Sequence, residues 1–142
     1  MAPPFGYARA YQAQSILTAS PGQLVLMLFD GSLRFLNQAR EAFAQDQDSP
    51  RRIENINASL VRAQNIIVEL RATLNLSEGG DYAATLDRLY EYYLRRLIEA
   101  NIRKQVEPVI EVSNLIQQLR DGWAEMLRKE FTNHFDATRG VA

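Results

Sequence analysis

The sequence predicts an all-α protein, an antiparallel up-down four-helix bundle in residues 20–128. Apolar residues recur every three or four positions in four stretches of about 20 to 25 residues, which is the spacing of one side of a helix. Short polar or Gly-containing segments separate these stretches, so successive helices are expected to be antiparallel. We expect residues 1–19 to form an N-terminal arm and residues 129–142, which lose the periodicity, to form a mobile tail.

The first helix is expected in residues 20–44. Ser20 is a suitable N-cap, Pro21 fits the first helical position, and Gln23 completes a capping box. The residues expected to point inward are Val25, Leu28, Phe29, Ser32, Phe35, Leu36, Ala39 and Phe43.

Three further residues of this helix point to contacts outside its inward stripe. Leu26 and Leu33 are seven residues apart and fall together on another side, where we expect them to contact a partner. Gly31 lies in mid-helix, where glycine costs up to about 1 kcal/mol relative to alanine. Close packing against a neighbouring helix would explain it.

The second helix, expected in residues 49–76 with Ser49 as N-cap and Pro50 next, has two apolar sides where a bundle helix needs one. The first stripe is expected in the core and consists of Ile53, Ile56, Leu60, Ala63, Ile67, Leu70 and Leu74. The second stripe consists of Ala58, Val61, Asn65, Val68 and Ala72. At about 100° per residue, its centre lies about 150° round the helix from the first.

A small bundle has no second core for this second stripe. It therefore indicates an interaction surface, covered either by the N-terminal arm or by another protein. Asn65 places a polar amide at its centre, which could bond a partner's backbone and fix its register or could simply be an exposed residue. The sequence leaves both interpretations open.

The third helix is expected in residues 82–103, with Asp81 as its N-cap and Gly79-Gly80 providing a left-handed end for the helix before it. The residues expected to be buried are Tyr82, Leu86, Leu89, Tyr93, Leu97 and Ala100. The remaining apolar residues, Tyr90, Leu94 and Ile98, extend this arc and are expected at the edge of a partner-binding groove.

The fourth helix is expected from Pro108 to about Arg128. Its apolar stripe consists of Val109, Val112, Ile116, Leu119, Trp123 and Met126.

The composition excludes several classes of function. The 142 residues fit one domain, and a formal net charge of -1 gives no general attraction to nucleic acid. There is no cysteine, and the single histidine lies near the end of the chain, so we expect no metal, no cofactor and no enzyme. The sequence has neither a signal peptide nor a long apolar run, so we expect a cytoplasmic protein without membrane insertion.

Several blocks of the sequence resemble the flagellar secretion chaperones of flagellin, the FliS family. The blocks are Ala10-Tyr11, TASPGQLVLMLFDG at 18–31, RAQNIIVEL at 62–70, Gly79-Gly80, LYEY at 89–92, RLIEAN at 96–101 and Trp123. They cover roughly residues 10 to 128 in the family's order. Phe29 and Glu91 stand where the family pattern has Tyr and Asp.

The resemblance implies a cytoplasmic chaperone that holds the C-terminal segment of flagellin, prevents its premature polymerisation and delivers it to the flagellar type III export apparatus. It also implies that the N-terminal arm, with Tyr7, Tyr11 and Ile16, covers part of the client site. An export-gate component remains an open second partner. Two other classes compete: a homodimer that buries the second stripe between two copies, and an amphipathic membrane-binding bundle, which the few basic residues on its polar sides disfavour.

Overall fold

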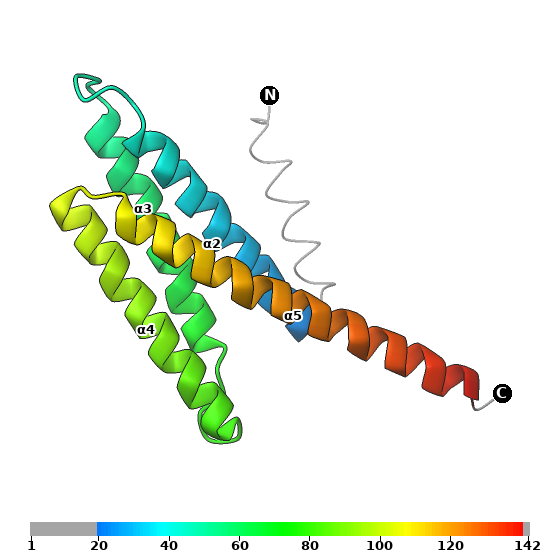
Figure 1. Cartoon of the computed structure of the whole chain (residues 1–142). Coiled ribbons are helices and arrows are strands. Elements are labelled where there is room, and N and C mark those ends of the chain that lie inside the picture. Colours follow the sequence, from blue (N-terminus) through cyan, green and yellow to red (C-terminus); the bar gives the residue numbers. More distant parts are fainter. Residues whose placement is uncertain (1–19, 141–142) are drawn as a thin grey trace, which may run out of the picture.

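The computed structural model describes residues 20–140, with side chains described through residue 133. The described residues form four α-helices: α2 (Pro21–Phe43), α3 (Arg52–Ala72), α4 (Gly80–Arg103) and α5 (Glu107–Gly140) (Figure 1). They pack in a ring, α2 against α3, α3 against α4, α4 against α5 and α5 against α2. The predicted all-α, antiparallel four-helix arrangement is confirmed. The N-terminal arm, with Tyr7, Tyr11 and Ile16, lies outside the described residues.

The core runs along the centre of this ring and receives side chains from all four helices. Its largest fully buried side chains are Tyr90, Tyr93, Phe29, Leu36, Ile56, Leu60, Ile67, Leu70, Leu97, Ile116, Val109 and Val112. Near the start of α2, Phe29 meets the edge of Trp123 from α5, with ring centroids 6.3 Å apart. The Trp123 Nε1–H also donates to the Gly22 carbonyl at 2.8 Å, which ties the start of α2 to α5.

The predicted start of α2 is confirmed. The Gln23 N–H donates to the Ser20 Oγ, and the Ser20 N–H donates to the Gln23 Oε1, so both halves of the capping box are formed. Gly31 is buried, and a Cβ atom there would lie 3.1 Å from Ile66 Cδ1 of α3. Close packing between α2 and α3 therefore accounts for this glycine, as predicted.

The predicted N-cap at Ser49 is wrong, because α3 begins three residues later. The Arg52 N–H donates to the Ser49 carbonyl at 3.2 Å, and Arg51 has φ -102° and ψ 0°. These values fit a type I turn with Pro50 at its second position, where proline is favoured. A Ser-Pro pair can therefore start a helix, as at Ser20, or form the turn that precedes one.

The segment between α3 and α4 also differs from its prediction. Helix α3 ends at Ala72 and not at residue 76. The Thr73 hydroxyl donates to the Leu70 carbonyl at 2.6 Å and so satisfies one of the carbonyl groups left free at the end of the helix. The left-handed glycine is Gly80, with φ +57°, at the first residue of α4 and not at the end of α3. Asp81 lies in the first turn of α4 and is not its N-cap.

Two residues predicted to be buried are exposed. Tyr82 is 63% exposed, because the inward stripe of α4 runs through Ala83 and Leu86 instead. Ile53 is 48% exposed, since it lies in the first turn of α3, at an end of the bundle.

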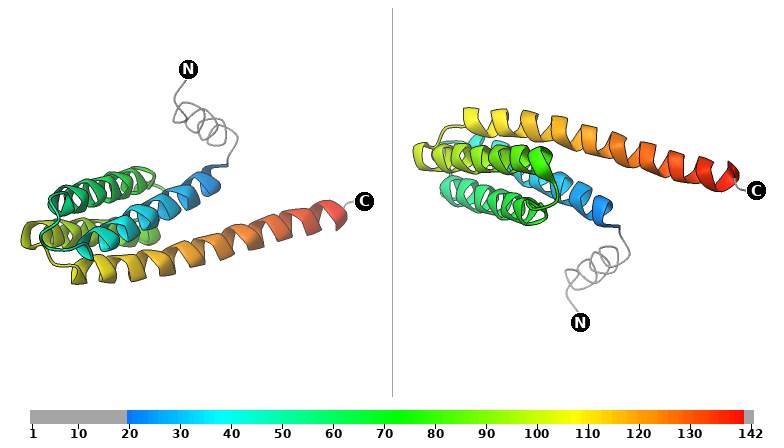
Figure 2. Two further views of the ribbon diagram at one scale, coloured as in Figure 1. Left: turned by 90° about the horizontal axis from the view of Figure 1, so that it is seen from above. Right: turned by 90° about the horizontal axis from the view of Figure 1, so that it is seen from below.

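Helix α5, the fourth helix along the chain, continues beyond its predicted end near Arg128. It is helical through Gly140, where a mobile tail was predicted, and it runs past the ends of the other three helices (Figure 2). Residues 129–133 are exposed, so this part of α5 has no core stripe. No proline interrupts this stretch, and Lys129 and Glu130 are good helix formers, although Thr132 and Asn133 are weak ones; continuing a formed helix costs less than starting one.

Candidate functional site

The second apolar stripe of α3 is exposed along its whole length in the structure. Val61 is 46% and Val68 53% exposed, and Ala58, Asn65 and Ala72 are exposed as well. The first stripe of the same helix, from Ile56 to Leu70, is buried. The prediction that α3 has a core side and a separate surface side is therefore confirmed.

Two polar contacts fix how α3 and α4 lie beside each other. The Arg71 guanidinium binds Asp87 in a bidentate contact at 2.6 and 3.3 Å, and the Lys104 ammonium donates to Asn57 Oδ1 at 2.6 Å. The two helices are antiparallel and rise by about 1.5 Å per residue, so positions between these contacts can be paired.

Between the two contacts, Val61 lies level with Ile98, and Asn65 lies level with Leu94. Ile98 is 49% exposed, and Leu94 is half-buried against the core. We call the surface formed by Val61, Asn65, Val68, Leu94 and Ile98 the α3–α4 face. It brings the exposed apolar side chains of Val61, Val68 and Ile98 from two helices onto one surface with the exposed amide of Asn65.

A shallow pocket of about 620 Å³ opens beside the α3–α4 face, toward the start of α3. Its lining includes Ala58 and Val61 of the second stripe, together with Glu54, Asn55, Asn57 and Arg62. All six lining residues belong to α3, so the pocket is an open depression on the surface of that one helix. A partner lying on the α3–α4 face would therefore find a hollow next to it.

The charged pair at one end of the α3–α4 face holds the two helices together. Hydrogen bonding from Arg71 lowers the pKa of the Asp87 carboxyl, and the same bond raises the pKa of Arg71. Glu91 lies 3.8 Å from Arg71 and adds a second, weaker attraction. These ion pairs are partly exposed, so their role is mainly to set the register of α4 against α3.

Tyr90 does not lie at the edge of this face, and that prediction is wrong. It is 2% exposed and meets the edge of the Tyr93 ring in the core, at a centroid distance of 6.3 Å. Burial raises the pKa of the Tyr90 hydroxyl. The apolar arc of α4 is wide, and its centre falls on Leu86, Tyr90 and Leu97, which leaves Ile98 at the outer edge.

Leu26 and Leu33 belong to a different surface. Leu33 is half-buried and lines a pocket of about 250 Å³ between α2 and α5, with Asn37, Arg40, Ser113, Asn114 and Gln117. Leu26, seven residues earlier on α2, is also half-buried. The structure therefore does not bring these two leucines together with the α3–α4 face.

Ile102 of α4, which is not among the predicted contact residues, is 78% exposed. It follows Ile98 by four residues and so continues the outer edge of the same helix side. That spacing was visible in the sequence and could have identified it.

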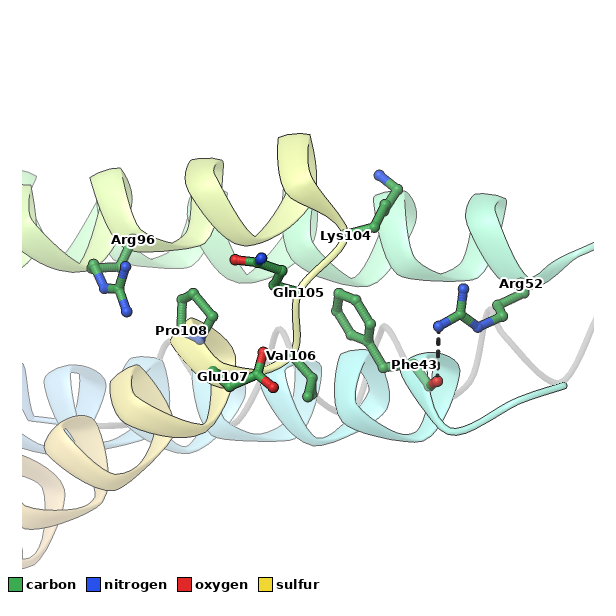
Figure 3. A pocket seen from close by; sticks show the side chains of 8 residues that line it. All are labelled: Phe43, Arg52, Arg96, Lys104, Gln105, Val106, Glu107 and Pro108. Atoms are coloured by element: carbon green, nitrogen blue, oxygen red, sulfur yellow. Dashed lines mark hydrogen bonds between the residues drawn. The ribbon is translucent and has the colours of Figure 1, made fainter. Parts of the chain in front are cut away.

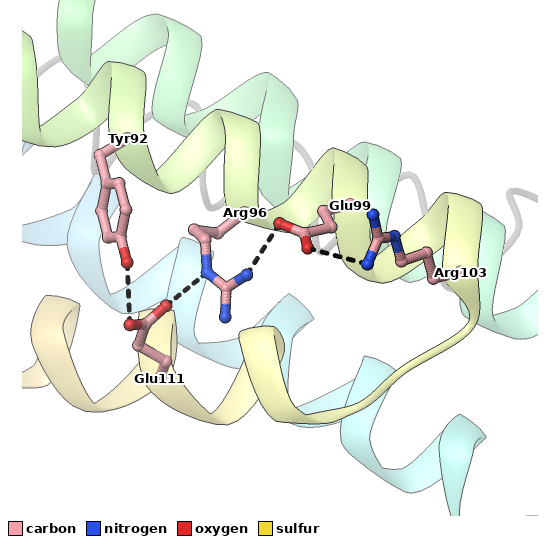
Figure 4. Close-up of polar contacts among 5 residues, drawn as sticks. All are labelled: Tyr92, Arg96, Glu99, Arg103 and Glu111. Carbon is pink, nitrogen blue, oxygen red and sulfur yellow. Dashed lines mark hydrogen bonds and ion pairs between the residues drawn. The ribbon is translucent and has the colours of Figure 1, made fainter.

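A cluster of charged side chains joins α4 to α5 on the side of α4 that faces away from α3 (Figure 4). The Tyr92 hydroxyl and Arg96 Nε donate to the two oxygens of Glu111 at 2.9 and 2.7 Å, and Arg96 also binds Glu99 at 2.8 Å. Hydrogen bonding from Arg96 and Tyr92 lowers the pKa of the Glu111 carboxyl. Arg103 lies 3.7 Å from the other oxygen of Glu99 (Figure 4), so the two arginines of the cluster balance its two carboxylates, which is typical of a structural contact.

Two features are absent from the described part of the chain. No three His, Cys, Asp or Glu side chains there are grouped as a metal site requires. Among the described helices, no segment has the length and hydrophobicity of a membrane span.

Comparison with known proteins gave one consistent family. The sequence model of a family described as "Flagellar protein FliS" matches residues 4–130. The chain is 38% identical over 121 residues to the "Flagellar secretion chaperone FliS" of Bacillus subtilis, covering 85% of this chain and 86% of the relative. It is 36% identical over 124 residues to the protein of the same name from Salmonella typhimurium, covering 87% and 88%. The protein of that name from Escherichia coli is 38% identical over 122 residues, covering 85% and 86%.

Proposed function

The chain belongs to the FliS family, and we propose that it is a non-enzymatic flagellar secretion chaperone that binds flagellin in the cytoplasm and delivers it for export. By holding its client, the chaperone prevents premature polymerisation and presents flagellin to the flagellar type III export apparatus. The bound part of the client is its C-terminal segment.

One observation carries the assignment of the binding surface. The second stripe of α3 is apolar and exposed, and Ile98 of α4 lies beside it, although a bundle of this size needs only one core. An apolar face of this kind accommodates the apolar side of an amphipathic helix, with anchor residues spaced by three or four positions. The α3–α4 face is thus our proposed site for a helical part of flagellin.

Asn65 gives this site a polar centre. An exposed amide between Val61 and Val68 can donate and accept hydrogen bonds with a partner's backbone or side chain. In an otherwise apolar contact, such a bond favours one register over its neighbours, since a shifted client would leave the amide unpaired. Asn65 therefore selects the register of the client, and Val61, Val68, Leu94 and Ile98 provide its buried area.

A long client segment would reach beyond the α3–α4 face. Binding coupled to folding typically covers a large area and costs about 2 to 5 kcal/mol in ordering, which keeps the complex reversible. A segment that wraps round the bundle would pass Ala72 at one end of the second stripe and Ala58 at the other. It would also contact Leu26 and Leu33 between α2 and α5.

We further propose that the N-terminal arm covers part of the client site before flagellin binds, through Tyr7, Tyr11 and Ile16. An export-gate component is a second partner in this scheme, since the client must leave the chaperone at the export apparatus. Self-association through the α3–α4 face is the alternative for the chain without client.

Co-expression with flagellin followed by co-purification tests the proposal. Full-length flagellin should co-purify with the chain, and flagellin lacking its C-terminal segment should not. Equal recovery of both clients would place the contact elsewhere in flagellin. A mass in solution that stays dimeric at low micromolar concentration and does not change on adding flagellin would favour the homodimer instead.

A further inference from the structure

A second candidate site lies at the end of the bundle where α2 ends and α4 leads into α5. It is a pocket of about 530 Å³ lined by Phe43, Arg52, Arg96, Lys104, Gln105, Val106, Glu107 and Pro108 (Figure 3). Three of these side chains are cationic and one is acidic. The pocket is separate from the α3–α4 face, but Lys104, whose ammonium binds Asn57 at the end of that face, also lines this pocket.

The three cations of this pocket differ in how their charge is balanced. Arg96 is fully matched, because its guanidinium binds the carboxylates of Glu111 and Glu99. Arg52 and Lys104 make no ion pair with any described residue. Their hydrogen-bond partners are neutral oxygens. Arg52 Nη2 donates to the Phe43 carbonyl at 3.0 Å, and the guanidinium also lies over the Phe43 ring, 5.9 Å from its centroid. Lys104 Nζ donates to Asn57 Oδ1, to the Asn101 carbonyl and to Asn101 Oδ1, so an anion would have to replace one of these three acceptors.

Arg52 and Lys104, which have no ion-pair partner, are both in unfavourable surroundings for a charged group. Arg52 Nε is buried without a hydrogen-bond partner among the described residues. Burial lowers the pKa of the Lys104 ammonium, since the charged form loses solvation. Lys104 also has a left-handed backbone, with φ 53° and ψ 51°, which is uncommon for a residue other than glycine. An anion in the pocket would balance the charge of both side chains and offset the lost solvation of Lys104.

The balance of charge indicates which anion fits. Glu107 contributes one negative charge at the first turn of α5, against the two positive charges of Arg52 and Lys104. The excess is a single positive charge, which matches a carboxylate better than a doubly charged phosphate. The apolar side chains of Phe43, Val106 and Pro108 add contact for the carbon atoms that carry such a group.

We propose that this pocket binds a carboxylate of the flagellin segment that runs past the α3–α4 face, held between Arg52 and Lys104. The inference rests on the proposed function, because it takes the same client as the occupant. Lys104 connects the two surfaces, so a client helix on the α3–α4 face can continue into the pocket at that end. The carboxylate comes either from an Asp or Glu side chain or from the end of the client chain.

The test is calorimetric titration of the full chain with a flagellin C-terminal peptide. Arg52→Gln and Lys104→Gln should each weaken binding by roughly threefold to tenfold, the loss expected for a charge-assisted hydrogen bond in a partly open site. Glu107→Gln should tighten binding, because it removes the one negative charge in the pocket. Arg34→Gln is the matched control: it removes an exposed cation of α2 that makes no ion pair within the described residues, and it should change nothing.

Changes on the client side keep the test independent of folding defects. Each Asp or Glu of the peptide is replaced by its amide, one at a time, and a further peptide carries an amidated C-terminus. One of these neutralised peptides should bind the unaltered chain more weakly than the original peptide does. The same peptide should bind the Lys104→Gln variant as tightly as it binds the unaltered chain, because the contact has already been lost. The peptide that does so identifies the carboxylate as a side chain or as the chain end.

Three outcomes would overturn the inference. The first is that Arg52→Gln and Lys104→Gln bind like Arg34→Gln. The second is that no neutralised peptide binds more weakly to the unaltered chain. Either of these, with normal binding by the unaltered chain, leaves the proposed function standing. The third, failure of the unaltered chain to bind the peptide, would refute the proposed function as well.

Discussion

Replacing Val61 and Val68 together by Glu separates client binding from folding. Both side chains are about half exposed, so two carboxylates there stay in contact with water in the free chain. Surface substitutions of this kind usually change stability by no more than about 0.5 kcal/mol. The double variant should therefore melt close to the unaltered chain.

Binding of flagellin should suffer far more than stability. Full burial of a valine side chain is worth about 1.5 to 3 kcal/mol, and roughly half of each side chain remains available to the client, so the lost burial amounts to about 2 kcal/mol for the pair. Covering each new carboxylate with apolar surface adds at least about 1 kcal/mol. The total of about 4 kcal/mol corresponds to a complex weaker by at least a hundredfold.

Calorimetric titration with a flagellin C-terminal peptide, beside thermal melts, measures both quantities. Met27→Glu is the matched control for the added charge, since Met27 is an exposed apolar residue of α2 outside the α3–α4 face. Leu60→Glu is the control for the core and should unfold the chain, because Leu60 is fully buried. Normal binding by the double variant would show that the site lies elsewhere, and melting like Leu60→Glu would show that the stripe belongs to the core.

Three further predictions concern the ends of the chain and its pH dependence. Removing residues 1–17 should leave the bundle folded, since the capping box of α2 begins at Ser20, but should raise the binding of an apolar dye; an unchanged dye signal would argue against a covering arm. Deleting residues 132–142 should lower the helical circular dichroism signal without changing the melting temperature, because Thr132 and Asn133 are exposed; a large drop in melting temperature would show that this end is docked. The pKa values of Asp87 and Glu111 are lowered from 3.8 and 4.5 in the folded chain, so their contribution to stability is fully present above those values and is lost as the pH falls below them. Asp87→Asn should therefore make the melting temperature fall less steeply below about pH 4. If the melting temperature of this variant falls equally steeply, other groups cause the acid destabilisation.

Local signals in the sequence were sufficient where short-range contacts decide the structure. The capping box at Ser20 involves only residues three apart, and it forms as predicted. The two stripes of α3 were also predictable, because a 3.6-residue period assigns each residue to a side without any knowledge of the neighbouring helices. Ser49 shows the limit of such signals, since the same Ser-Pro pair gave a type I turn there.

The candidate site depends on contacts between helices, which the sequence does not determine alone. Helix α4 has apolar residues over more than half of its circumference. Only its packing against α3 and α5 decides that Tyr90 is buried and Ile98 is exposed. The pairing of Val61 with Ile98 follows from the Arg71–Asp87 and Lys104–Asn57 contacts. The pocket beside Lys104 combines side chains from all four helices and the loop between α4 and α5, so no stretch of sequence could reveal it.

The absence of cysteine from the chain allows the central claim, that flagellin covers the α3–α4 face, to be tested at a single position. Val68→Cys introduces one thiol at an exposed site of that face, and Arg34→Cys introduces one on α2 as the control. The measurement is the rate at which each thiol reacts with iodoacetamide, with and without saturating flagellin. We predict that flagellin slows the reaction at position 68 by at least about tenfold and leaves position 34 unchanged, as expected if the thiol is buried in the complex. An unchanged rate at position 68, with flagellin bound, would contradict the account.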